Sequence, residues 1–206
     1  MSTTRLPAEE RRASLLSAAC GLFASRSYHG TTTADIARAA GVTEPVLYRH
    51  FPSKCALYLA CMDWSWHEVK ELWADRLAAE PEPGLWLSAI GRAFVESEAE
   101  RPRSSPLWVQ ALGESSVDPE IAAYMRAHMH EVHEYVADVI RRAQEAGGVP
   151  SERDPDAEAW IFIALGLLTM ADEVVGTLLQ DAWPAIRESR IAWLRGPLHD
   201  SRAGAR

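Results

Sequence analysis

Residues 31–54 read TTTADIARAAGVTEPVLYRHFPSK, and this stretch decides the fold of the N-terminal part of the chain. Thr32 stands three residues before Asp35. This is the spacing of a capping box, in which the hydroxyl accepts a hydrogen bond from the amide of residue 35. The carboxylate of that residue in turn accepts one from the amide of residue 32. Gly41 ends the short helix that follows, where a tight turn favours a residue without a Cβ. Val42 is apolar inside that turn and is expected to fill the angle between two helices. The pattern predicts two helices joined by a tight turn.

A second helix is predicted over Thr43–Phe51. Thr43 supplies the cap, and Pro45 comes early enough that its missing N–H costs nothing. Leu47 and Phe51 are four residues apart, so they share the inward face. The outward face then carries tyrosine, arginine and histidine with few carboxylates, which suits a polyanion. On this pattern alone, a helical hairpin with no role in DNA binding remains the alternative.

Charge is distributed unevenly along the 206 residues. The net charge of −8 argues at first against a nucleic-acid partner. Residues 1–60, however, hold seven Lys/Arg and four Asp/Glu, a net +3, and the remainder carries −11. Ser53 is expected to cap the next helix, and Lys54 beside it adds charge to the free amides, a combination that favours phosphate. The first 60 residues thus form a weakly basic head, and the remaining residues form an acidic body. This difference in charge would orient the protein on DNA.

The rest of the chain is predicted to be helical. Ala, Leu, Glu and Arg dominate, strand-like alternation is missing from the sequence, and Gly and Pro gather at breaks that leave about nine helices. The longest apolar run, Trp160–Met170, is too short to span a bilayer and is interpreted as a buried helix. The N-terminus lacks the apolar stretch of a signal peptide, so the expected location is cytoplasmic. Three cysteines without a CxxC pair are expected to be buried, inert thiols, with a redox sensor as the alternative.

Three blocks near the N-terminus resemble the signature of the tetracycline-repressor-like (TetR) regulators. Ile-Ala-x-x-Ala-Gly-Val at 36–42, Leu-Tyr-x-His-Phe at 47–51 and Ser-Lys at 53–54 stand in register. The resemblance implies an all-α protein, with a three-helix helix-turn-helix DNA-binding domain at 1–52 and a larger helical effector-binding and dimerisation domain at 53–206. It also implies a repressor whose homodimer binds a palindromic double-stranded DNA operator and is released by a small-molecule effector.

The same resemblance assigns DNA contacts within the head. Phosphates would be held by Tyr48, His50, Lys54 and Thr31 or Thr32. Base edges would lie close to Thr33, Thr43, Pro45, Val46 and Arg49. The first group would give affinity and the second sequence choice. Two positions depart from the family pattern: Pro45, where many members carry glycine, and Glu44, since an acid facing DNA is unfavourable unless it accepts a hydrogen bond from cytosine.

For the body, the resemblance implies a homodimer formed by the last two long helices and a ligand cavity among the preceding ones. Trp160–Leu179 is apolar nearly all round, so one face serves its own core and another needs a partner. Trp183, Ile186 and Trp193 share one face of the last helix, although both helices could simply be core. Eight tryptophans suggest a large, partly aromatic cavity, with core filling as the alternative. The predicted effector contacts are Trp64, Trp66, Trp86, Trp108, Tyr124, His128 and Phe162.

Residues 128–134 hold three histidines and two glutamates, a composition that invites a metal interpretation. Helical spacing places His128 alone on the apolar stripe, as core or as a polar anchor for a ligand, and places His130 and His133 on a solvated face. Two histidines on one turn without a third ligand do not make a metal site, and no metal or cofactor is expected. Without a Gly-rich phosphate loop or GxSxG motif, an enzyme is not expected. The remaining alternative is a regulator that acts without a small ligand, through a protein partner or as an activator.

Overall fold

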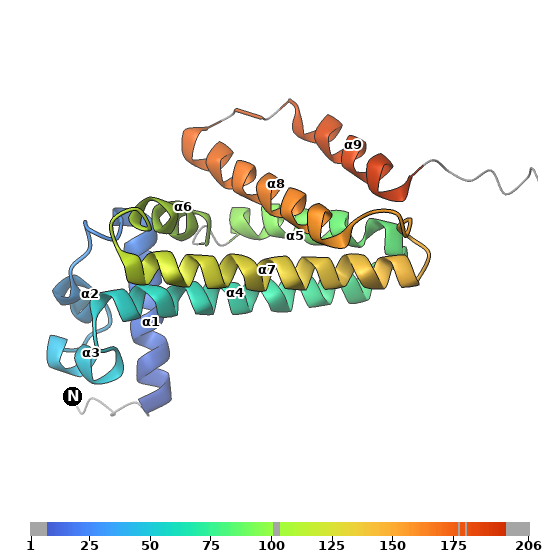
Figure 1. Cartoon of the computed structure of the whole chain (residues 1–206). Coiled ribbons are helices and arrows are strands. Elements are labelled where there is room, and N and C mark those ends of the chain that lie inside the picture. The colour runs from blue at the N-terminus through green and yellow to red at the C-terminus, as the bar shows by residue number, and fades with distance from the viewer. Residues whose placement is uncertain (1–7, 101–103, 177, 180, 197–206) are drawn as a thin grey trace, which may run out of the picture. The chain divides into compact units, whose positions relative to one another are not determined.

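The computed structural model describes residues 8–100, 104–176, 178–179 and 181–196. Within these ranges every regular element is a helix, as predicted, and the nine α-helices follow one another as coloured in Figure 1. The elements are α1 (Ala8–Arg26), α2 (Thr33–Ala39), α3 (Glu44–His50), α4 (Lys54–Ala79), the short 3-10 helix η1 (Pro83–Leu85), α5 (Trp86–Glu100), α6 (Ser104–Glu114), α7 (Pro119–Glu145), α8 (Pro155–Val175) and α9 (Trp183–Arg195). Among the described residues no helix has the length and apolarity needed to cross a membrane.

The chain divides into two compact units, and the division falls inside three helices. The first unit comprises residues 1–70 and 97–127, and the second comprises residues 71–96 and 128–206. The first therefore holds α1, α2, α3 and α6 complete, and the second holds η1, α8 and α9 complete. The domain boundary predicted after residue 52 remains a prediction.

In the first unit, α1 buries one face and ends at a turn that needs a glycine. Leu15, Ala19 and Phe23, four residues apart, are fully buried, so they form the core face of the helix. Ser27 then takes a left-handed conformation, with φ = 76°, which ends the helix. A Cβ on Gly30 would lie 2.2 Å from the carbonyl oxygen of Arg26, so only glycine fits this turn.

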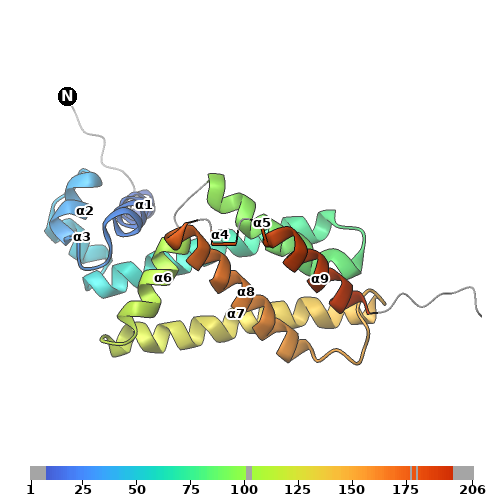
Figure 2. The same ribbon diagram turned by 90° about the horizontal axis from the view of Figure 1, so that it is seen from above.

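The helix-turn-helix forms as the sequence predicts. Thr32 caps α2, with its hydroxyl accepting the amide of Asp35 at 3.1 Å. Gly41 lies in the left-handed region, with φ = 67°, where a side chain would be strained. The amide of Val42 donates to the carbonyl of Ala37, which closes the turn. α2 packs on both α1 and α3, and Figures 1 and 2 show these three helices grouped together.

Side-chain hydrogen bonds join helix α6 to α4, to α1 and to the turn after α1, all in the first unit. The hydroxyl of Tyr58 donates to the carbonyl of Leu107 at 2.8 Å, and Gln110 donates to the carbonyl of Phe23. His29, in the turn after α1, lies 2.8 Å from the carboxylate of Glu114 at the end of α6. Since these bonds reach helices far apart in sequence, they fix α6 against the head.

The second unit contains a pair of antiparallel helices, α8 and α9, which run side by side in Figures 1 and 2. Glu158 near the start of α8 is buried and pairs with Arg190 of α9. The indole N–H of Trp193 donates to the same carboxylate at 2.7 Å. A buried charge with two partners holds the ends of the two helices together.

Three expectations for the second unit need correction. Trp160 and Ile161 are 42% and 40% exposed, so Trp160–Met170 is not a wholly buried helix, because only one side of α8 faces its own core. Helix α8 ends at Val175, before the predicted Leu179, since Gly176 leaves the helix with φ = 82°. His133 is buried, not solvated, because its ring stacks on that of Trp160 at 4.6 Å.

The predicted burial of His128 and of the three cysteines is confirmed, and so is the predicted exposure of His130. His128 is buried on the predicted apolar stripe, and His130 is exposed. The three cysteines are free and buried. Within the described ranges, no three His, Cys, Asp or Glu side chains come together as a metal site would require.

Candidate nucleic-acid interface

Helix α3 has one buried side and one exposed side, as the sequence predicts. Leu47 is fully buried and Phe51 is 3% exposed, so these two residues hold the helix to the head. The guanidinium of Arg12 lies 4.9 Å from the centre of the Phe51 ring and covers it. On the other side Tyr48 is 47% exposed and Arg49 is exposed. The exposed side therefore presents one phenol and one permanent cation.

The remaining predicted residues of α3 lie around this exposed side. Thr43 and Pro45 are exposed, while Val46 and His50 are half-buried. Thr43 stands at the N-cap position, as predicted, but its side chain makes no capping hydrogen bond. Its hydroxyl is thus not committed to holding α3.

The two threonines proposed for phosphate differ in position. Thr31 is fully buried, and its hydroxyl donates to the backbone carbonyls of Leu22 and Ser27. This corrects the expectation for Thr31, because its side chain lies inside the head and holds the turn after α1. Thr32 is exposed, and its hydroxyl also donates to the carboxylate of Asp35 at 2.7 Å, which lowers the pKa of Asp35. Of the two, only Thr32 lies on the surface.

A hydrogen-bonded group that the sequence did not predict links α2 to α3. The hydroxyl of Thr33 donates to the carboxylate of Glu44 at 2.6 Å, and the hydroxyl of Tyr48 lies 3.2 Å from that of Thr33. Glu44 is therefore held by a neighbour and does not project freely from α3. The sequence carried part of this signal, since Glu44 is a departure from the family pattern, but its contact with a residue eleven positions earlier depends on the angle between the helices.

Lys54 lies at the start of α4, beside the end of α3. Ser53 caps α4, since its hydroxyl accepts the amide of Ala56 at 2.9 Å. The Lys54 ammonium lies 4.4 Å from the centre of the Tyr28 ring, a cation–π contact that orients the side chain. Burial lowers the pKa of Lys54, and the carboxylate of Glu114 opposes that shift. Tyr28 was not predicted from the sequence, and nothing in its spacing marks it as a partner of Lys54.

The seven predicted effector contacts are divided between the units. Trp64, Trp66, Trp108 and Tyr124 belong to the first unit, and Trp86, His128 and Phe162 belong to the second. Several use their polar atoms structurally: the Tyr124 hydroxyl donates to Asp63 at 2.7 Å, and the Trp86 indole donates to the carbonyl of Glu80 at 3.0 Å. Each of these two side chains therefore has a partner inside its own unit.

In the second unit, Phe162 belongs to an aromatic cluster. The Trp73 ring meets Phe162 edge-on at 5.7 Å and lies 5.6 Å from Tyr135. A Cβ on Gly91 would lie 3.6 Å from the Phe162 ring, so α5 approaches the cluster closely. Trp73 is 4% exposed and was not among the predicted contacts.

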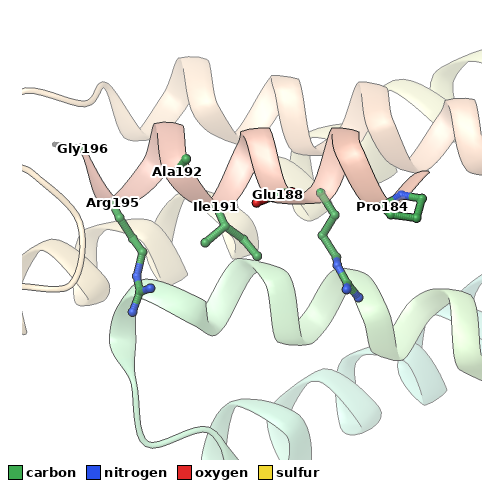
Figure 3. Close-up of a pocket in the computed structure, with 7 residues that line it drawn as sticks. Pro184, Glu188, Ile191, Ala192, Arg195 and Gly196 are labelled. Atoms are coloured by element: carbon green, nitrogen blue, oxygen red, sulfur yellow. The ribbon is translucent and has the colours of Figure 1, made fainter. Parts of the chain in front are cut away.

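A groove lies along α9 and is separate from the predicted effector residues. Its volume is about 520 Å³, and it is lined by Pro184, Arg187, Glu188, Ile191, Ala192, Arg195 and Gly196. Figure 3 shows Ile191 and Arg195 pointing from α9 toward α5. Arg195 pairs with Glu82, and no predicted effector residue lines the groove.

Comparisons with known proteins match both parts of the chain. Residues 15–61 match the model of bacterial regulatory proteins of the tetR family, and residues 83–167 match the BetI-type transcriptional repressor C-terminal model. The HTH-type transcriptional activator FasR of Mycolicibacterium smegmatis is 28% identical over 187 residues, covering 91% of this chain and 80% of FasR.

Solved structures share the fold. A TetR-family regulator from Rhodococcus sp. superposes with a TM-score of 0.81 at 19% identity, covering 91% of this chain and all of that one. AibR, in complex with isovaleryl coenzyme A and operator DNA, superposes with a TM-score of 0.65 at 20% identity, covering 91% of this chain and 99% of AibR.

Proposed function

Because the chain belongs to the TetR family of DNA-binding transcription regulators, we propose that it acts as a homodimer that binds a palindromic operator and represses transcription until a small effector releases it. The observation that carries this proposal is the two-sided α3. Leu47 and Phe51 anchor the helix, Tyr48 and Arg49 are left exposed, and Lys54 follows at the start of α4. Arginine and lysine in such positions supply the affinity for phosphates and the choice of bases.

The dimer is supported by apolar surface that one chain leaves uncovered. The large apolar side chains exposed on α8, on the segment after it and on α9 are Trp160, Ile161, Val174, Val175, Leu178 and Trp193. Single exposed apolar residues need no explanation, but a run of them along paired helices is typical of an interface. A second copy packing its own α8 and α9 on these residues would cover them, and its two-fold axis would match two half-sites about one DNA turn apart.

We prefer repression to activation because the C-terminal match is to a repressor model. Activation is the second candidate, because FasR, with 28% identity, is named an activator. Transcription in vitro from the operator-bearing promoter separates the two. Added protein lowers the transcript if it represses and raises it if it activates.

The effector is proposed to be small and largely apolar or aromatic. Within the second unit, the cluster of Trp73, Tyr135 and Phe162 supplies aromatic surface. His128 is buried two turns before Tyr135 on the same face of α7, so it can supply a polar contact. Effectors of this chemistry are expected to raise the thermal midpoint of the protein and lower its affinity for the operator.

The test of DNA binding starts with selection of bound sequences from random duplexes. The selected sequence is expected to be palindromic. By fluorescence anisotropy, Arg49→Ala should weaken binding by about 1–3 kcal/mol. Arg126→Ala removes an arginine of α7 that is also exposed and serves as the control. If Tyr48→Ala/Arg49→Ala binds the selected duplex as tightly as the unaltered protein, the proposed interface is wrong.

Light scattering after size exclusion tests the dimer. The expected mass is twice 22.8 kDa. A monomer at micromolar concentration would refute the homodimer. Trp160→Glu, which places a charge on the uncovered face of α8, should shift the mass toward the monomer.

A further inference from the structure

The carboxylate of Glu44 is fixed in place by a short hydrogen-bond chain between α2 and α3. Thr33 Oγ1 donates to Glu44 Oε1 at 2.6 Å, and Tyr48 Oη lies 3.2 Å from Thr33 Oγ1. The Thr33 hydroxyl has a single proton, which goes to Glu44. The Tyr48 hydroxyl must therefore be the donor in the second contact. The Tyr48 proton thus points to the Thr33 hydroxyl, and the Thr33 proton points to the Glu44 carboxylate.

One oxygen of this carboxylate is left open. No donor or cation in the described part of the chain lies on Glu44 Oε2, and Glu44 is only half-buried. A carboxylate only accepts hydrogen bonds, so Oε2 can be satisfied only by a donor from outside the head. It also lies on the helix whose exposed side carries Tyr48 and Arg49.

The operator offers few groups that this oxygen can accept from. Phosphates repel it, and guanine and thymine present acceptors, O6, N7 and O4, on their major-groove edges. Adenine offers an amino group next to the acceptor N7, whereas cytosine offers its N4 amino group with no acceptor beside it on the same edge. The chemistry therefore favours cytosine.

We propose that Glu44 determines operator specificity by accepting a hydrogen bond from the amino group of one cytosine in each half-site. Thr33 is the positioning residue that holds the carboxylate for this contact. The inference rests on the proposed binding of DNA through α3, and goes beyond it by naming the base and the side chain that recognises it.

The experiment is selection of bound duplexes from a random pool, followed by anisotropy on single-base variants of the selected duplex. The unaltered dimer should prefer cytosine at one position per half-site by about fivefold or more. Glu44→Gln should move the preference at that position to adenine, since the amide pairs with N6 and N7. Other positions should keep their preferences. Glu10→Gln removes one exposed acid from α1 and is the matched control for charge.

Thr33 variants test the positioning role. Thr33→Val removes the hydroxyl with little change in shape and should weaken the cytosine preference at that one position. Thr33→Ser restores the donor and should restore the preference. A residue that merely stabilises the head would alter the thermal midpoint and would not change one base position selectively.

The outcomes separate this inference from the proposed function. If the unaltered protein selects no sequence, the proposed function fails. If it selects an operator and Glu44→Gln keeps the same base preference while binding all duplexes more tightly, Glu44 is only a repulsive charge and the inference is wrong. The inference also fails if the preference at the affected position is for guanine or thymine.

Discussion

Lys54 gives the sharpest test of how the head holds DNA. The sequence contains only two lysines, Lys54 and Lys70, and both belong to α4. Each ammonium lies over an aromatic ring, Lys54 at 4.4 Å from the centre of Tyr28 and Lys70 at 5.3 Å from that of Trp66. Lys54→Met and Lys70→Met therefore remove the same charge from similar settings, but only Lys54 is predicted to contact a phosphate.

The size of the effect follows from counterion release. Each phosphate neutralised contributes about 0.9 to the slope of log K against log salt concentration. A homodimer loses one contact per subunit, so Lys54→Met should lower the slope by about 1.8. Between 50 and 200 mM salt the unaltered protein should then lose about tenfold more affinity than the variant. The ring of Tyr28 accepts the methionine side chain, so the fold should be kept.

Salt titrations followed by fluorescence anisotropy measure this slope. Reductive methylation with ¹³C gives an independent readout, because only Lys54, Lys70 and the N-terminus add methyl signals. The Lys54 signal should move when operator is added, and the Lys70 signal should stay. Equal slopes for Lys54→Met and the unaltered protein, or an equal reduction in Lys70→Met, would refute a phosphate contact at Lys54.

Three further changes test the packing. Burial raises the pKa of Tyr28 to about 12 and raises that of Tyr58 as well, so the folded state keeps protons that the unfolded chain loses near its ordinary tyrosine pKa of about 10. Stability should therefore fall as the pH rises from about 10 toward 12, with a shallower decline in Tyr28→Phe, measured by urea unfolding at each pH. Arg190→Leu leaves the buried carboxylate of Glu158 without its cation and should cost about 3 kcal/mol in urea unfolding, whereas Glu158→Leu/Arg190→Leu should recover most of that loss. Gly41→Ala should cost about 1–2 kcal/mol, because the alanine must take φ = 67°, and Gly41→Asn should cost less.

The sequence predicts the head well because its signals are local. The Thr32 cap, the Gly41 turn and the buried Leu47 each depend on residues a few positions apart, and each is present in the structure. His133 and Trp160 were misplaced because their burial depends on how α7 meets α8. A helix that is apolar nearly all round does not reveal which side faces its own core.

In the candidate interface, too, the sequence predicts local features but not contacts between helices. Exposure of Tyr48 and Arg49 followed from spacing along a single helix. Burial of Thr31 did not, because it depends on the turn set by Ser27 and Gly30. The contact between Thr33 and Glu44 joins two helices across a turn, so a single helix pattern cannot contain it.

The hydrogen bonds inside the head limit its non-specific affinity for phosphates relative to its recognition of base sequence. Thr31 is buried, the Thr32 hydroxyl is engaged by Asp35, and the Tyr48 proton is directed toward Thr33. Few neutral donors are then ready for phosphates, and the net charge of +3 over residues 1–60 is modest. Since non-specific binding depends on phosphate contacts, a single head should bind random duplex weakly. Tight binding would then require two heads on one operator, so a variant that disrupts the α8–α9 face should lose operator binding even though its α3 is unchanged.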